Sequence, residues 1–179
     1  MLSVDPGAKG WIAVVSYRGV HAVRPVPTEK VTVKRNRKVV SEKTGKKVTR
    51  KVDSNVTHLN YQSMVYYLKY FKAVMRRRNC ESYGLVYETV NTFHRAGQSI
   101  NTTIKQHINI QAWPIACACL RIPVYEVGTD WKKRMGLDKD KEKSIKLLGD
   151  LCPGLDCGGS DDLAESCLLG YEFLQGLNQ

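Results

Sequence analysis

Short apolar runs separated by turn residues predict most of the strands in this chain. Runs rich in valine, isoleucine, leucine or tyrosine, bounded by glycine, proline or aspartate, have the length and composition of β-strands. They occur at Met1–Val4, Gly10–Tyr17, Val20–Val26, Tyr83–Val90 and Ile122–Val127.

A longer apolar repeat predicts the helices. From Asn55 to Arg78 apolar residues recur about every 3.6 positions, and the closing Arg76-Arg77-Arg78 suits a helix C-terminus. Further helices are predicted at Asn101–Leu120, Lys139–Leu151 and Ser160–Leu174, with one or two helical turns at Thr129–Met135. We expect Pro114 to kink or break the second helix, and Ser160 to cap the last.

The order of these elements predicts an α/β fold. Three consecutive strands joined by short turns are antiparallel, and the later strands, separated by helices, run parallel to the first. We therefore expect one mixed five-stranded sheet flanked by helices, in a single domain spanning residues 1–179.

Residues 30–53 interrupt this order with a basic β-hairpin. Valines space the segment like two strands, and Lys43-Thr44-Gly45-Lys46 resembles the turn between them. One interpretation is an arm that contacts DNA. The other is a solvated ribbon whose lysines only discourage pairing with other sheets.

Composition narrows the class of protein. With 42% hydrophobic and 25% charged residues the chain is globular rather than disordered. It has no apolar run of membrane-spanning length, and MLSVDPGAKG is not a secretory signal, so we expect an intracellular protein of a bacterium or virus-infected host cell, or of an organelle. The six cysteines form no C-x-x-C pair and are expected to be reduced, buried thiols without zinc.

The net charge of +11 indicates a polyanionic partner, although a basic surface without a partner has the same charge. Its distribution is uneven. Residues 30–53 contain ten basic and two acidic side chains, whereas residues 138–179 contain four basic and nine acidic ones. A basic middle and an acidic end therefore lie in one chain.

Acidic residues occur at the ends of three predicted elements. Asp5 ends the first strand, Glu88 lies in the apolar fourth strand, and Asp161, Asp162 and Glu165 begin the last helix. Taken singly they are a turn residue, a solvent-facing side chain and favourable charges at a helix N-terminus. If the first and fourth strands are adjacent, however, the carboxylates gather and need a cation, which hard oxygen ligands select as Mg²⁺ or Mn²⁺.

Four ordered blocks of the sequence resemble one known family. They are SVDPGAKGWIAVVS, YETVNTFHRAGQS, IPVYEVGTDWKKRMGLDKDKEKSIKLLGDLCPGL and SDDLAESCLLG. Together they are similar to the RuvC-type Holliday junction resolvases of the RNase H-like superfamily, especially the phage and viral branch. The likeness spans nearly the whole chain except residues 30–53.

The resemblance implies a homodimeric, structure-selective endonuclease that nicks two strands of a four-way DNA junction with Mg²⁺ or Mn²⁺. Asp5 and Glu88 would be metal ligands. The third ligand is open, because one family spacing matches Asp162 and Glu165 and another matches Asp161 and Glu165. The alternatives are a related nuclease acting on branched or flap DNA or on RNA–DNA hybrids, and a non-catalytic nucleic-acid-binding module.

The candidate DNA contacts come from three segments. Lysines and arginines of the hairpin and after Trp131 suit phosphate, and an aromatic after the second acidic strand suits a wedge at the crossover. The candidates are Lys34, Arg35, Arg37, Lys38, Lys46, Lys47, Phe93, His94, Arg95, Gln98, Ser99, Lys132 and Lys133. Packing explains Phe93 equally well, and solvated helix lysines explain Lys132 and Lys133 nearly as well.

Overall fold

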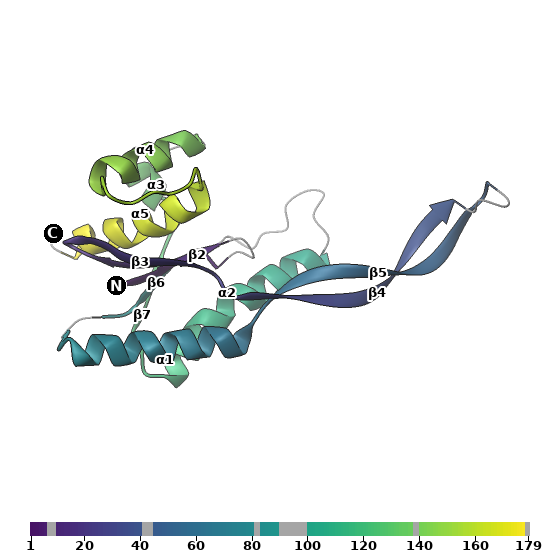
Figure 1. Ribbon diagram of the computed structural model, residues 1–179, viewed down its shortest axis with the longest axis horizontal. Coiled ribbons are helices and arrows are strands. Elements are labelled where there is room, and N and C mark those ends of the chain that lie inside the picture. Colours follow the sequence, from purple (N-terminus) through teal and green to yellow (C-terminus); the bar gives the residue numbers. More distant parts are fainter. Residues whose placement is uncertain (7–9, 41–44, 81–82, 90–99, 138–139, 178–179) are drawn as a thin grey trace.

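A mixed five-stranded sheet forms the centre of the protein in the computed structural model, which describes residues 1–6, 10–40, 45–80, 83–89, 100–137 and 140–177 (Figure 1). Its order is β3-β2-β1-β6-β7. The strands are β1 (Leu2–Val4), β2 (Trp11–Ser16), β3 (Gly19–Pro25), β6 (Leu85–Glu88) and β7 (Val124–Val127). Strand β2 is antiparallel to β1 and β3, whereas β6 is parallel to β1 and to β7. The predicted mixed five-stranded sheet, with three antiparallel strands and then parallel ones, is confirmed.

Helices cover both faces of the sheet. Helices α1 (Tyr61–Arg77) and α2 (Ile100–Cys119) pack on one face, where Leu68 and Trp113 are fully buried against Leu2, Val4 and Ile12. Helix α5 (Asp161–Gly176) packs on the other face, and α3 (Trp131–Arg134) and α4 (Lys141–Leu151) lie outside it (Figure 1). The central strands β1 and β6 are therefore buried on both sides, as their apolar sequences require.

A long two-stranded ribbon leaves this body. Strands β4 (Thr28–Val40) and β5 (Lys47–Leu59) pair only with each other, in an unbroken antiparallel register from Thr28–Leu59 to Val40–Lys47. The ribbon extends far beyond the helices (Figure 1). The predicted hairpin is thus confirmed, but it is longer than residues 30–53, and the first two residues of its predicted turn, 43 and 44, lie outside the described residues.

One predicted helix start was wrong, and one predicted helix break is absent. The first helix begins at Tyr61 rather than Asn55, because residues 55–59 continue the ladder of β5 and Asn60 caps the helix by accepting a hydrogen bond from the Ser63 amide. Pro114 lies inside α2 without ending it. The buried side chains of Trp113 and Cys117 on either side of Pro114 pack the helix onto the core, which overrides the local tendency to break.

The remaining helix predictions need only small changes. The Ser160 hydroxyl accepts from the Leu163 amide and caps α5, as predicted, and that helix runs two residues further than expected. Asp140 caps α4, so this helix starts at Lys141. No described helix has both the length and the apolar content needed to cross a membrane.

The cysteines differ in environment more than the sequence indicated. Cys117 and Cys167 are buried, but Cys119 is exposed at the end of α2, which corrects the expectation of uniformly buried thiols. Burial raises the pKa of Cys117, and likewise that of Cys167, to about 12. These two thiols are therefore neutral and shielded at ordinary pH.

We expect a thiol reagent to modify Cys119 rapidly in the native protein and to leave Cys117 and Cys167 unmodified until the protein unfolds. The reason is that the thiolate reacts, and both burial and the raised pKa suppress it at the two core positions. Peptide mass spectrometry after timed alkylation, with a denatured sample as the control, measures the order. Equal native rates at Cys117 and Cys119 would contradict the packing of α2.

Candidate active site

Asp5 and Glu88 lie at neighbouring strand ends in the middle of the sheet. Strands β1 and β6 are parallel, with Val4 opposite Tyr87, so Asp5 and Glu88 follow at the same end. Residues 2–4 and 85–87 are buried, while both acidic residues are only half-buried. The Asp5 amide donates to the Trp11 carbonyl at 3.0 Å, which extends the β1–β2 ladder through this residue.

Both acidic residues belong to the sheet face that α5 covers. Side chains alternate along a strand, so Asp5 shares a face with Ser3, and Glu88 shares a face with Val86. Val86 packs in the apolar cluster that contains the α5 residues Leu163, Cys167 and Leu168. The alternation therefore directs the two carboxylates to the same side as the last helix.

Helix α5 runs along this face toward the carboxylate end. A Cβ added at Gly170 would lie 2.9 Å from Val15 Cγ2 and 3.0 Å from Ser3 Cβ, so the helix backbone lies close to the strands there. One turn earlier, the buried Ser166 hydroxyl donates to the Trp11 carbonyl at 3.0 Å. Since Trp11 is also bonded to Asp5, the first turn of α5 extends over the end of the sheet that bears Asp5 and Glu88.

The three acidic residues of α5 have different surroundings. Asp162 precedes Ser166 and Gly170 at four-residue intervals and so lies nearest the row that touches the sheet. Glu165 is ion-paired with Lys132, with 2.7 Å between Oε2 and Nζ. Asp161 is ion-paired with Lys141, the first residue of α4. The structure therefore separates one sheet-side carboxylate from two that lysines hold.

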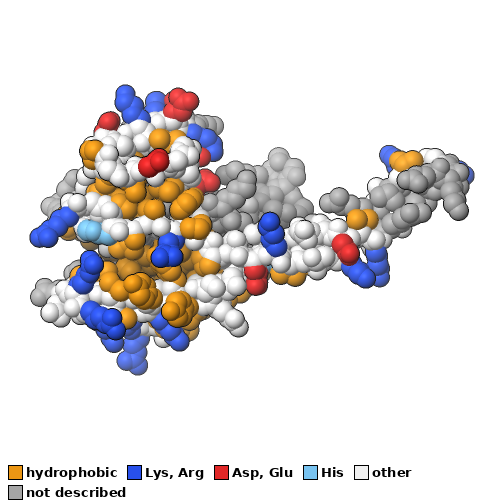
Figure 2. Space-filling view, in the orientation of Figure 1, with side chains coloured by type: hydrophobic (Ala, Val, Ile, Leu, Met, Phe, Trp, Pro, Cys, Tyr) orange, Lys and Arg blue, Asp and Glu red, His pale blue; other side chains and the backbone are white. Residues whose placement is uncertain are grey.

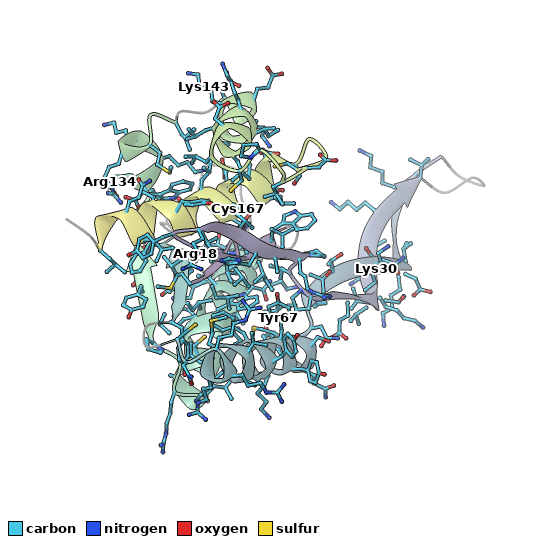
Figure 3. All side chains as sticks on the ribbon, turned by 60° about the vertical axis from the view of Figure 1, so that its left-hand side comes forward. Arg18, Lys30, Tyr67, Arg134, Lys143 and Cys167 are labelled. Atoms are coloured by element: carbon cyan, nitrogen blue, oxygen red, sulfur yellow. The ribbon has the colours of Figure 1, made fainter. Side chains whose placement is uncertain are left out.

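Lys132 is positioned by the short helix α3. The preceding Trp131 is buried, and the Lys132 ammonium lies 5.6 Å from the centroid of its ring. A second ion pair, from Arg134 to Glu172, joins α3 to the outer side of α5, whereas Cys167 lies on the sheet side of the helix (Figure 3). Two contacts to α5 thus hold α3 beside the acidic residues.

The lysine contacts shift the ionisation of the pairs. The pKa of Asp161 is lowered, chiefly by its hydrogen bond from Lys141. The pKa of Lys141 is raised by the same hydrogen bond, and the negative charges of Asp162 and Glu165 add to this effect. The first turn of α5 is therefore a region of negative charge, and it raises the pKa of the exposed Lys141.

These acidic side chains are not arranged as a set of metal ligands in the described part of the chain. Among the residues that the structure describes, no three His, Cys, Asp or Glu side chains are arranged to hold a metal ion. Asp5 and Glu88 share a strand end, and the α5 acids point into the same region or toward lysines. The arrangement is a set of carboxylates at one end of a sheet, partly neutralised by two ammonium groups.

The residues predicted to contact DNA differ in exposure, and some of them lie outside the described part of the chain. Lys34, Lys38, Lys46 and Lys47 are exposed on or beside the ribbon, and Arg35 and Arg37 occupy positions in β4. Figure 2 shows basic side chains along the ribbon and around the α1 side of the body. Lys133 is exposed, whereas Lys132 is half-buried beside Glu165. Five candidates lie outside the described residues: Phe93, His94, Arg95, Gln98 and Ser99.

Sequence reasoning missed Lys141 as a neighbour of the acidic residues. Lys141 and Asp161 are twenty positions apart and belong to different helices, so no spacing pattern joins them. Helices α4 and α5 pack against each other, with the buried Leu148 in the same apolar cluster as Leu163 and Leu168. Only this tertiary contact places the lysine at the start of α5.

Comparisons with known proteins find a likeness in structure alone. No protein-family profile matches the chain, and no curated protein matches its sequence. The chain is similar to Thermus thermophilus RuvC solved in complex with a Holliday junction substrate, with 14% identity, a TM-score of 0.48, and coverage of 98% of this chain and 94% of that chain. A second Thermus thermophilus RuvC structure is 14% identical with a TM-score of 0.46, covering 98% and 95% of the two chains.

Proposed function

We propose that this protein is a metal-dependent, structure-selective endonuclease that cuts branched DNA, with the four-way junction as its substrate. The observation that carries the proposal is the parallel pairing of β1 and β6, which brings Asp5 and Glu88 to one end of the sheet on the face covered by α5. Residues 1–179 would form one nuclease domain, with the basic ribbon inserted between β3 and α1.

The donor chemistry fits a hard divalent cation. Asp5, Glu88 and Asp162 supply only carboxylate oxygens, which suit Mg²⁺ or Mn²⁺, and Asp161 and Glu165 lie within the same first turns of α5. When bound, such ions activate water and stabilise the charge that develops on a phosphodiester during hydrolysis. The choice of Asp162 as the third ligand rests on its place beside the sheet-facing row of α5.

The chain's own residues have three tasks in this proposal. Asp5 and Glu88 are held by the central strands, so their carboxylates keep a fixed separation and direction. Lys132 and Lys141 limit the repulsion among the helix acids and place positive charge where a phosphate approaches. Lys133, exposed beside Lys132, extends that charge toward solvent.

A homodimer follows from the proposed substrate. One chain offers one carboxylate set, and paired nicks across a junction require two sets related by symmetry. The surface that best fits a second copy is an open groove of about 750 Å³ between α1 and α2, lined largely by apolar side chains that include Met64, Val65, Ile108 and Ile115. The partly exposed Ile108 and Ile115 would be covered there.

One observation favours a second candidate. Asp161 and Glu165 are both held by lysines, which is also the arrangement of a non-catalytic module that keeps the fold and binds nucleic acid without hydrolysis. Such a module needs the basic surface but not the carboxylates at the strand ends.

The deciding experiment is cleavage of a synthetic mobile four-way junction with and without Mg²⁺. We expect paired nicks only with the metal, and faster cleavage of the junction than of flap DNA, linear duplex or RNA–DNA hybrid at matched salt. Two nicks within one binding event, scored on a supercoiled cruciform, report the dimer. Preference for hybrid would select the related nuclease, and binding with no turnover on any substrate would select the non-catalytic module.

A further inference from the structure

The β4–β5 ribbon has two chemically different faces. In an antiparallel pair, residues opposite each other share a face, and the faces alternate along each strand. The register from Lys30–Thr57 through Lys34–Asp53 and Asn36–Lys51 to Val40–Lys47 defines one face. We call it the lysine face, and its charged members are Lys30, Lys34, Lys38, Lys47, Lys51 and the single acid Asp53.

The opposite face has no lysine or arginine near the body, where Glu29 pairs with His58. Val31 pairs with Val56 there, and Val33 and Val52 occupy nearby positions of the same face. Farther along the ribbon this face has three arginine positions, Arg35, Arg37 and Arg50. All five lysines of the lysine face are exposed. In the half of the ribbon nearest the body the basic charge is therefore one-sided, which protection of a sheet edge from pairing does not require.

The ribbon is rooted at the end of the sheet that bears Asp5 and Glu88. Pro25, the last residue of β3, lies opposite Trp11. The Val26 amide donates to the Gly10 carbonyl at 2.9 Å, and the neighbouring Trp11 carbonyl accepts from the Asp5 amide. At the other strand, the Asn60 amide donates to the Pro27 carbonyl at 2.9 Å. These bonds fix the base of the ribbon beside Asp5.

The length of the ribbon matches a turn of duplex DNA. Thirteen residues per strand at about 3.3 Å each give a reach of about 43 Å. One turn of B-DNA measures about 34–36 Å. A ribbon that begins at the candidate active site therefore reaches duplex about one helical turn away. Figure 1 shows this ribbon as an extended arm that leaves the body.

We propose that the lysine face binds the phosphate backbone of a duplex arm about one helical turn from the phosphodiester that lies at Asp5 and Glu88. The proposal rests on the proposed nuclease function for the position of the cut, but not for the binding itself. A longer duplex arm therefore contacts more of these lysines, so the strength of binding depends on the length of the arm.

The chemistry of the lysine face selects duplex phosphates over other nucleic-acid features. Residues 28–40 and 47–59 contain no Phe, Tyr or Trp, so the ribbon offers no stacking platform for unpaired bases. Lysine neutralises phosphate as a compact point charge. The contact is therefore expected to be strongly salt-dependent and independent of sequence.

The test uses the full chain in EDTA, where binding is measured without cleavage. The ribbon variant replaces Lys34, Lys38, Lys47 and Lys51 with glutamine. The matched control removes four cations from α1 and its C-terminal cap, by Lys69→Gln, Arg76→Gln, Arg77→Gln and Arg78→Gln, all exposed. Each protein is titrated with four-way junctions whose arms are about 8 or about 25 base pairs, shorter and longer than the distance the ribbon spans.

On long arms the ribbon variant is expected to lose about tenfold or more in affinity, and its slope of log affinity against log salt is expected to fall by about two to four. On short arms its loss of affinity is expected to be smaller, because Lys38 and Lys47, ten and twelve positions from the base of the ribbon, lie beyond the end of the arm. The α1 control keeps the difference between long and short arms, and arginine at the same four ribbon positions restores binding on long arms.

The opposite results are equally clear. An unchanged salt slope, or an equal loss of affinity on long and short arms, would contradict the proposal that the lysine face binds the distant part of the arm. If the arm-length effect appears but no protein cleaves with Mg²⁺, the ribbon proposal stands and the nuclease proposal fails. If cleavage is intact and the arm-length effect is absent, the outcome is the reverse.

Discussion

Asp5→Asn and Glu88→Gln are each expected to reduce junction cleavage in Mg²⁺ at least about a thousandfold, which corresponds to about 4 kcal/mol of lost transition-state stabilisation. Each change removes one carboxylate oxygen from the pair at the ends of β1 and β6 and keeps the size of the side chain. Junction binding in EDTA is expected to persist, because the basic surface is untouched. Cleavage rates under single turnover, beside binding isotherms, measure both effects.

Glu126→Gln is the matched control for Glu88→Gln. Glu126 lies on β7 opposite Tyr87, one position before the residue that faces Glu88, so its side chain belongs to the other face of the sheet. It has the same chemistry one strand away and is expected to leave cleavage unchanged. Full activity in Asp5→Asn and Glu88→Gln together would contradict the assigned site, whatever the control does.

The same assay ranks the acids of α5. Asp162→Asn is expected to match the Asp5 variant in its loss, because Asp162 is nearest the row of α5 that touches the sheet. Asp161→Asn is expected to lose less, since Lys141 already holds that carboxylate at the edge of the helix. A larger loss at Asp161 than at Asp162 would reverse the choice of the third ligand.

The central sheet was predictable because local and long-range signals agree there. Asp5-Pro6-Gly7 ends the first strand, the apolar run at Tyr83–Val90 is too short for a helix, and a strand that follows a crossover helix pairs in parallel beside an earlier one. These signals together predict Asp5 and Glu88 at adjacent strand ends. In the structure β1 and β6 are indeed hydrogen-bonded neighbours. Their role as ligands remains a prediction.

The start of α1 could not be predicted because two periodicities overlap. Val56 and Leu59 fit a helix at a spacing of three, while the polar residues Asn55 and Thr57 flank Val56 as in a strand. The register across to Val31 and Thr32 decides for the strand, and that pairing is not local. The ribbon therefore extends further into the chain than its charge pattern indicated.

The ion pairs of the acidic residues in α5 also could not be predicted from the sequence. Their sequence spacing fits two ligand patterns, and only the packing of α3 and α4 shows that Lys132 and Lys141 hold Glu165 and Asp161. Ion pairs between separate helices leave no periodic signal. Asp162 is distinguished by the contacts of Ser166 and Gly170, four and eight positions later, with the sheet.

Gly170→Val is expected to destabilise the protein by about 3 kcal/mol, because α5 has no room for a side chain at this point. Even a Cβ would meet Val15 Cγ2 at 2.9 Å and Ser3 Cβ at 3.0 Å. Both residues are fully buried on central strands, so neither can move aside without disturbing the sheet. Urea unfolding followed by circular dichroism measures the loss.

Gly149→Ala is the control, because a Cβ at this exposed position within α4 has open space around it. There the change is expected to stabilise the protein by up to about 1 kcal/mol, since alanine favours the helix over glycine.

Helix α5, which Gly170→Val would displace, also bears Asp162. Cleavage by the folded fraction of that variant should therefore fall as well, and normal stability in Gly170→Val would show that α5 does not lie against β1 and β2 as described.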